Sequence, residues 1–144
     1  MNRKTVALLP VALLLVSCIQ TSLYTLTPEE QAYLDEAKRC PVEFKVSKEA
    51  SADAWGRAQS FVGRYSRMKL QIATDYVIQT YNPTAGGYGH YITRTPVGDS
   101  AQLNVECVGD INSIFSGANL SNNAHILAYY IRTGSPPSER LIAK

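Results

Sequence analysis

Residues 51–65, with the sequence SADAWGRAQSFVGRY, show the clearest periodic pattern of the chain. Apolar side chains recur every three or four residues over about three turns, which predicts an amphipathic helix with one buried stripe. The stripe consists of Ala54, Trp55, Ala58, Phe61, Val62 and Tyr65. Ser51 is the predicted N-cap. Small residues form a second stripe, and because glycine costs a helix about 1 kcal/mol relative to alanine, we expect another backbone to pack against it. These small residues are Gly56, Ser60 and Gly63.

The sequence before this helix predicts a strand and an earlier helix. Val42–Val46 alternates apolar and charged residues, as a half-buried strand does. Thr27-Pro28-Glu29-Glu30 combines a capping residue, a proline suited to the first turn and the glutamate of a capping box. We therefore expect a helix from this point to about Arg39, ending before Cys40-Pro41.

The sequence after the central helix predicts four strands. Met68 to Gln79 alternates in character, and Gly89–Thr95 forms a second strand. Ala101–Val108 forms a third, with Leu103, Val105 and Cys107 on its inner face. His125–Thr133 is apolar on both faces and is the predicted fourth strand. The predicted fold class is α+β: an N-terminal helix, then a strand–helix–four-strand antiparallel sheet with a helix packed across one face.

From Val42 onward this order of elements resembles the cystatin topology. The resemblance implies an architecture and no activity, since cystatin inhibitors carry a Gln-x-Val-x-Gly segment on a hairpin. The nearest string, Gln59–Gly63, has a different spacing and lies within the predicted helix.

The predicted last strand has one face that the central helix does not cover. Leu127, Tyr129 and Ile131 lie on that face. We expect the first helix to cover this face through Tyr33, Leu34 and Ala37. The alternatives are a ligand or a partner protein.

The N-terminus predicts export. Arg3 and Lys4 precede an apolar run of 11 residues, Val6–Val16. This run is shorter than the roughly 20 residues that a transmembrane helix needs, and the pattern is typical of a secretory signal. Leu15-Val16-Ser17-Cys18 resembles the lipobox of bacterial lipoprotein precursors. The resemblance implies that Cys18 is acylated and becomes the new N-terminus. Ile19 in place of aspartate favours an outer-membrane anchor facing the periplasm.

These features predict four regions. Residues 1–17 are the lipoprotein signal peptide, and 18–26 are a lipid-anchored tether, of which residues 19–26 extend at most roughly 28 Å. Residues 27–134 are a single α+β domain, and 135–144 are a loose C-terminal tail. After residues 1–17 are removed, 12 basic and 12 acidic residues remain. A neutral body argues against a nucleic-acid partner, and the sequence does not indicate an oligomeric state.

Two cysteines follow Cys18. Because an even pair in an oxidising compartment is typical of a disulfide, we predict a bridge between Cys40 and Cys107. A metal-binding or redox pair is the alternative, but neither residue lies in a Cys-x-x-Cys motif or near a histidine in sequence.

No established catalytic or metal-binding motif was identified, and no cofactor is expected. His90, His125, Asp75 and Glu106 lack the spacing of known sites. The aromatic residues Tyr81, Tyr88 and Tyr91 flank the Gly86-Gly87 loop; they are candidates for partner binding or for packing at the end of the hairpin. Phe115, in the segment 110–123 that lacks a strand period, and Tyr129 are further partner-binding candidates.

The resulting hypothesis is a membrane-anchored, non-enzymatic lipoprotein that binds a protein of the cell envelope. A protein that binds a small apolar or saccharide ligand is the alternative. A hydrolase with an unrecognised site, involving Asp75, Glu106 or His125, is a third possibility.

Overall fold

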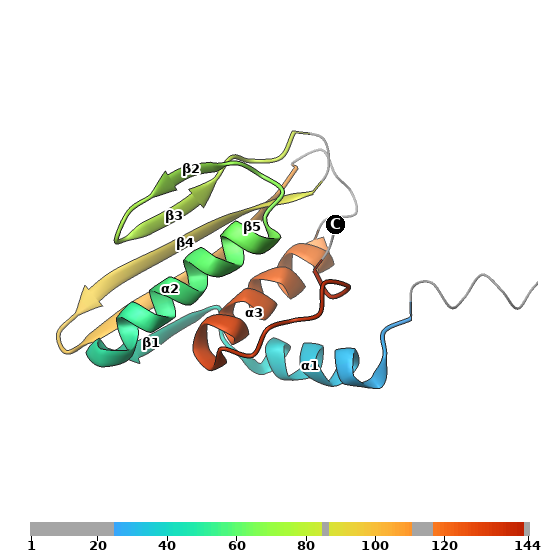
Figure 1. Ribbon diagram of the computed structural model, residues 1–144, viewed down its shortest axis with the longest axis horizontal. Helices are drawn as coiled ribbons and strands as arrows, with labels where there is room; N and C mark the ends of the chain where they lie inside the picture. The colour runs from blue at the N-terminus through green and yellow to red at the C-terminus, as the bar shows by residue number, and fades with distance from the viewer. Residues whose placement is uncertain (1–24, 85–86, 111–116, 143–144) are drawn as a thin grey trace, which may run out of the picture.

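The computed structural model describes residues 25–84, 87–110 and 117–142. Within these ranges the protein is an α+β fold with a five-stranded antiparallel sheet and three helices. The elements in chain order are α1 (Pro28–Arg39), β1 (Glu43–Ser47), α2 (Lys48–Tyr65), β2 (Leu70–Ala73), β3 (Val77–Thr80), β4 (Tyr88–Val97), β5 (Ser100–Gly109) and α3 (Gly117–Thr133). The order across the sheet is β1-β5-β4-β3-β2, so the last strand pairs with the first (Figure 1).

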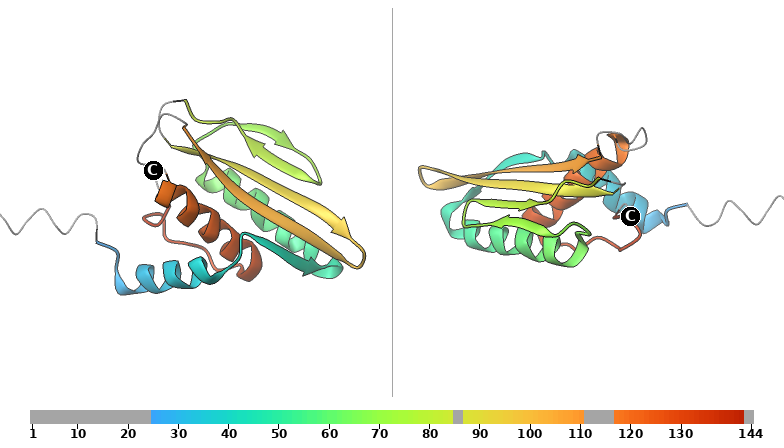
Figure 2. Two further views of the ribbon diagram at one scale, coloured as in Figure 1. Left: turned by 180° about the vertical axis from the view of Figure 1, so that it is seen from behind. Right: turned by 90° about the horizontal axis from the view of Figure 1, so that it is seen from above.

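The sheet has one face covered by helices and one polar face. α2 and α3 pack against each other on the same face, and α1 packs on α3 (Figure 2). The alternation predicted for β5 is confirmed, because Leu103 and Val105 are buried while Glu106 on the other face is exposed. None of the helices in the described ranges is both long enough and apolar enough to cross a membrane.

The N-terminus of α1 has the predicted capping box. The Glu30 amide donates to Thr27 Oγ1 at 3.2 Å, and the Thr27 amide donates to Glu30 Oε2 at 2.9 Å. These bonds satisfy amide groups that the first turn of a helix leaves without partners. The helix ends at Cys40, whose backbone is extended before Pro41, as expected.

The predicted apolar stripe of α2 is confirmed. Its residues Ala54, Trp55, Ala58, Phe61 and Val62 are buried, and Tyr65 packs partly buried against them. The helix begins four residues earlier than expected, because the Ser47 side chain at the end of β1 accepts the Ala50 amide and forms the N-cap in place of Ser51. The expected close packing on the small-residue stripe is wrong, since no atom lies within 4 Å of a Cβ built on Gly56 or Gly63.

The single strand expected from Met68 to Gln79 is instead the β2–β3 hairpin. Thr74 forms the turn: its hydroxyl accepts the amides of Tyr76 and Val77 at 3.2 and 3.0 Å. β2, which precedes this turn, contains a bulge between Leu70 and Ile72. As a result, Leu70 pairs with Thr80 and Ala73 pairs with Ile78. Leu70 and Ala73 therefore face the same side of the sheet although three residues separate them.

The strand expected at His125–Thr133 is wrong, because this segment belongs to α3. Ile126, Leu127, Ala128 and Ile131 are all buried, since α3 lies between the sheet, α2 and α1. A helix enclosed on several sides is apolar around most of its circumference, so its sequence resembles that of a buried strand. The expected uncovered strand face does not exist. Tyr129 instead packs edge-on against Tyr33 of α1, with ring centroids 5.1 Å apart.

The C-terminal residues are held more firmly than expected. Leu141 and Ile142 are buried in the hydrophobic core. The Ser138 hydroxyl donates to Glu30 Oε1 at 2.8 Å, and Arg140 lies 3.7 Å from Glu30 Oε2. The hydrogen bond from the Thr27 amide, followed by that from Ser138, lowers the pKa of Glu30. Residues 135–142 therefore belong to the folded domain.

Candidate functional site

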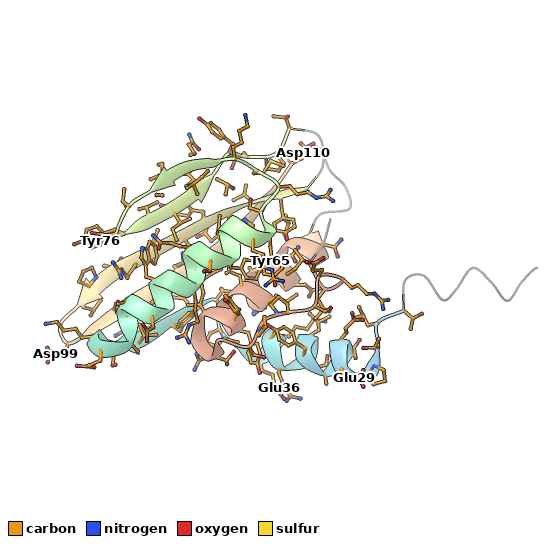
Figure 3. The ribbon with its side chains drawn as sticks, in the orientation of Figure 1. Glu29, Glu36, Tyr65, Tyr76, Asp99 and Asp110 are labelled. Carbon is orange, nitrogen blue, oxygen red and sulfur yellow. The ribbon has the colours of Figure 1, made fainter. Side chains whose placement is uncertain are left out.

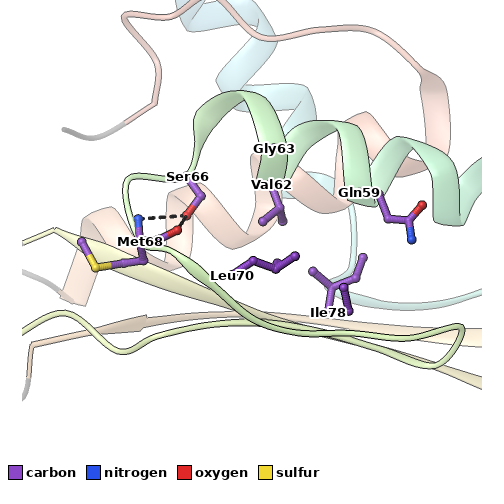
Figure 4. Close-up of a pocket in the computed structure, with 8 residues that line it drawn as sticks. Gln59, Val62, Gly63, Ser66, Met68, Leu70 and Ile78 are labelled. Carbon is purple, nitrogen blue, oxygen red and sulfur yellow. Dashed lines mark hydrogen bonds between the residues drawn. The ribbon is translucent and has the colours of Figure 1, made fainter.

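A groove opens between α2 and the β2–β3 hairpin, on the helix-covered side of the sheet. Its volume is about 370 Å³. The α2 side is formed by Gln59, Val62, Gly63 and Ser66, and the hairpin side by Met68, Leu70, Ala73 and Ile78 (Figure 4). We call this feature the hairpin groove. It exists because α2 packs mainly on α3, β1, β4 and β5, whereas β2 and β3 form the far edge of the sheet.

The hairpin is attached to α2 at both ends of this groove. At the turn end, the Trp55 indole Nε1 donates to the Thr74 carbonyl at 3.2 Å. At the other end, the Ser66 hydroxyl donates to the Met68 carbonyl at 3.0 Å and accepts the Met68 amide at 3.1 Å (Figure 4). Because these hydrogen bonds restrain both ends of the hairpin, they reduce the entropic cost of ordering the groove around a ligand.

The walls of the groove are mostly apolar. Val62 and Ile78 form its buried part, with 5% and 1% of their surfaces exposed. Leu70 faces the same side of the hairpin as Ile78 but is 52% exposed. Covering the exposed half of a leucine contributes roughly 1 kcal/mol to binding. None of the lining residues has a titratable side chain, so the groove is suited to contact with an apolar molecule.

The segment that forms most of the groove carries a positive charge. Residues 54–74 contain Arg57, Arg64, Arg67 and Lys69 and no aspartate or glutamate. Arg67 and Lys69 are exposed and flank Met68, which lies at one end of the groove, opposite Gln59 (Figure 4). Arg57 packs elsewhere, with its Nη1 3.1 Å from a Cβ built on Gly134.

The structure separates the five aromatic residues predicted to bind a partner. Tyr81 is 53% exposed just after β3, while Tyr91 is half-buried on the polar face of the sheet, opposite Gln79 and Glu106. Tyr88 is buried, and Tyr129 is half-buried against Tyr33. Phe115 lies outside the described residues. Tyr81 and Tyr91 thus keep accessible rings, whereas Tyr88 has the packing role that the sequence left open.

The predicted disulfide is absent from the structure, where Cys40 and Cys107 are both free thiols. Pairing between β1 and β5 begins at Glu43, so Cys40 precedes the ladder and turns toward α3, where Arg132 Nη1 lies 3.5 Å from its sulfur. Cys107 lies instead opposite His90 on the buried face of β4 and β5. Burial raises the pKa of the Cys107 thiol to about 12.

The polar residues considered for catalysis lie on separate parts of the molecule. Asp75 is in the hairpin turn next to Tyr76, while Glu106 is on the polar face of the sheet. His125 is on α3, where its Nδ1 lies 2.7 Å from the Cys40 carbonyl. The structure does not bring these three side chains together. Across the described ranges, no three His, Cys, Asp or Glu side chains form a group able to hold a metal ion.

His90 and Tyr88 form a buried polar pair at the start of β4, with ring centroids 5.1 Å apart. Within residues 25–84, 87–110 and 117–142, both ring nitrogens of His90 and the Tyr88 hydroxyl lack a hydrogen-bond partner. Burial lowers the pKa of His90 to about 4 and, together with the nearby Cys107, raises that of Tyr88. His90 is therefore neutral at pH 7.

No protein-family model, curated protein or solved structure matches this chain.

The groove was not predicted from the sequence. The small residues of α2 were recognised, but a packed backbone was expected where Gly63 borders open space. Leu70 and Ile78 were placed on one continuous strand. The Thr74-Asp75 pair, which is typical of a turn, was the available signal for a hairpin.

Proposed function

We propose that this protein is a lipid-anchored binding protein of the cell envelope that holds a small apolar ligand in the hairpin groove. The observation that carries the proposal is a preformed groove of about 370 Å³ in which Leu70 is 52% exposed. Small-molecule sites range from about 300 to 1,000 Å³ and are mainly apolar with a few polar groups. The Gln59 amide and the Ser66 hydroxyl supply such groups here.

The anchoring part of the proposal is based on the lipobox resemblance at Cys18, which lies outside the described residues. The position of the groove is compatible with it. Residue 25 leads into α1, and the Arg140 side chain donates to the Thr25 carbonyl at 3.0 Å. This end of α1 and the β2–β3 hairpin lie at opposite sides of the domain (Figure 1). A tether attached at α1 would thus leave the groove accessible.

Two substitutions on β2 test the proposal. Leu70→Asp places a charge in the groove, whereas Ile72→Asp places the same charge on the other face of the strand, since Ile72 pairs with Gln79 beyond the bulge. Both side chains are exposed, at 52% and 38%, so neither change should unfold the protein. Native mass spectrometry of protein purified from its source should show bound mass on wild type and Ile72→Asp, and none on Leu70→Asp. Absence of bound mass on wild type, or its retention by Leu70→Asp, would contradict the proposal.

A second candidate function is binding of an envelope protein, which the exposed residues on the outer side of the hairpin favour. Ile72, Tyr76 and Tyr81 are 38%, 56% and 53% exposed. Tyr76 projects from the turn end of the hairpin (Figure 3). The same two variants distinguish the candidates. Loss of a crosslinked partner with Ile72→Asp but not with Leu70→Asp would assign the function to this outer side.

A further inference from the structure

β1 leaves one edge of the sheet without a neighbouring strand. It is the first strand in the order β1-β5-β4-β3-β2, and among the described residues it pairs with β5 alone (Figure 1). The other edge strand, β2, contains a bulge, which hinders pairing with a further strand. β1 instead keeps an unbroken register with β5 over all five of its residues. An unpaired edge of this regular kind can accept a strand from another chain.

Two residues of β1 direct their backbone groups outward from this edge. The Val105 amide of β5 donates to the Val42 carbonyl at 3.0 Å, which marks a hydrogen-bonded pair. Such pairs alternate with non-bonded pairs along antiparallel strands, so Phe44 also bonds to β5. The amide and carbonyl groups of Glu43 and Lys45 therefore face away from β5 and are open to another strand.

The side chains of the same two residues carry opposite charges on the polar face of the sheet. Glu43 and Lys45 are both exposed, and the side-chain amide of Gln102 on β5 donates to the Glu43 carboxylate. Neither charge has an ion-pair partner among the described residues. Charged side chains on an edge strand hinder its pairing with most other strands. A partner strand must therefore present the opposite charge at each of these positions.

A second copy of β1 meets this requirement in one antiparallel register. Residues 42–46 read Val-Glu-Phe-Lys-Val, so the segment is complementary in charge to its own reverse. The outward backbone groups can align with Glu43 opposite Glu43, with Lys45 opposite Lys45, or with Glu43 opposite Lys45. The first two alignments place like charges directly opposite each other, which is destabilising. The third forms two pairs of opposite charge and places Val42 opposite Val46 on the other face.

We propose that the protein forms a twofold-symmetric dimer through β1, in which the two five-stranded sheets join into one continuous antiparallel sheet. Phe44 lies at the twofold axis, and Glu43 of each copy exchanges two backbone hydrogen bonds with Lys45 of the other. The same surface is used on both copies, as a twofold interface requires. The dimer does not depend on the proposed function. The hairpin groove lies at the opposite edge of the sheet and stays open in both copies.

Charge reversal on β1 tests this proposal in the full-length protein purified in detergent. Glu43→Lys and Lys45→Glu each convert both pairs of opposite charge into pairs of like charge. Each should raise the dissociation constant of the dimer roughly tenfold or more, measured by sedimentation velocity over a series of protein concentrations. Glu43→Lys combined with Lys45→Glu restores two pairs of opposite charge and should dimerise as the wild type does. Both side chains are exposed, so these changes should not unfold the protein.

Zero-length crosslinking checks the register directly. A carbodiimide joins a carboxylate to an amine with loss of water, and should link Glu43 of one copy to Lys45 of the other. In a mixture of isotopically light and heavy protein, a link between copies gives a crosslinked peptide with one light and one heavy half. A link within one copy gives two halves of the same kind, so mass spectrometry distinguishes the two.

Lys69→Glu is the matched control, because it makes the same charge change at an exposed position beside β2, at the other edge of the sheet. It should leave the dimer intact. Loss of the dimer with Lys69→Glu would assign the contact to the other edge and overturn the proposal. A wild-type protein that stays monomeric and gives no mixed link, or a double variant that does not dimerise, would overturn it as well.

Discussion

His90 occupies an apolar environment with its imidazole packed between aromatic rings. Its centroid lies 5.1 Å from that of Tyr88 and 5.9 Å from that of Phe61, and 1% of the residue is exposed. Because burial lowers its pKa from 6.5 to about 4, the unfolded chain binds a proton in this pH range that the folded protein excludes. The free energy of unfolding is therefore not reduced by His90 above pH 6.5, and it decreases as the pH falls from 6.5 to about 4.

We predict that the free energy of unfolding decreases by roughly 2–3 kcal/mol between pH 7 and pH 4.5 because of His90. Carboxyl groups titrate mainly below this range, so urea unfolding at a series of pH values isolates the effect. His90→Leu should remove most of the decrease, while His125→Gln, on α3, should retain it. An unchanged pH dependence in His90→Leu would show that another group is responsible.

At the scale of elements, two glycines illustrate how packing and helix propensity differ. Gly56 lies in α2 with nothing within 4 Å of an added Cβ. A Cβ on Gly89 in β4 would lie 2.9 Å from both Thr80 Oγ1 and the Tyr81 carbonyl oxygen. The Thr80 hydroxyl also accepts the His90 amide at 2.8 Å, so it has little freedom to move.

We therefore predict opposite effects of the same substitution at these positions. Gly56→Ala should raise the free energy of unfolding by about 1 kcal/mol, because alanine is the better helix former. Gly89→Ala should lower it by about 1–3 kcal/mol through steric overlap. Thermal and urea denaturation measure both changes. Destabilisation by Gly56→Ala, or tolerance of Gly89→Ala, would contradict the packing described for that position.

The elements differ in how well their sequences predicted them. α1, β1 and β5 were predicted within a few residues, because capping residues and strict alternation are local signals. α2 was predicted with its buried stripe, although its start was placed four residues late. α3 was assigned to the wrong class of element, since enclosure by the sheet and two helices removes the polar face that normally marks a helix.

On the scale of the whole molecule, the N-terminal end of α1 and the β2–β3 hairpin lie at opposite sides of the domain (Figure 1). The C-terminal residues pack near this end of α1, with Leu141 and Ile142 in the core and Arg140 in contact with Glu30 and Thr25. An anchor at Cys18, as proposed, would attach the domain at the α1 end and leave the hairpin accessible.

We predict that Cys18 carries the lipid. In cells fed a clickable fatty acid, the wild-type protein should be labelled, whereas Cys18→Ala should be unlabelled and accumulate as the longer precursor. Cys40→Ala and Cys107→Ala are matched controls and should remain labelled, because both thiols belong to the folded body. Labelling of Cys18→Ala, or none on the wild type, would contradict the anchoring proposal.

The amino-acid sequence by itself determined the helices and strands whose signals are local: the capping box of α1, the apolar stripe of α2 and the alternation of β5. Only the tertiary structure decided the identity of α3, the separation of the two thiols and the existence of the groove. Each of these depends on how segments distant in the sequence are placed: what surrounds α3, where β1 leaves β5, and how the bulged β2 stands beside α2. The local periodicity of a sequence does not specify such placement.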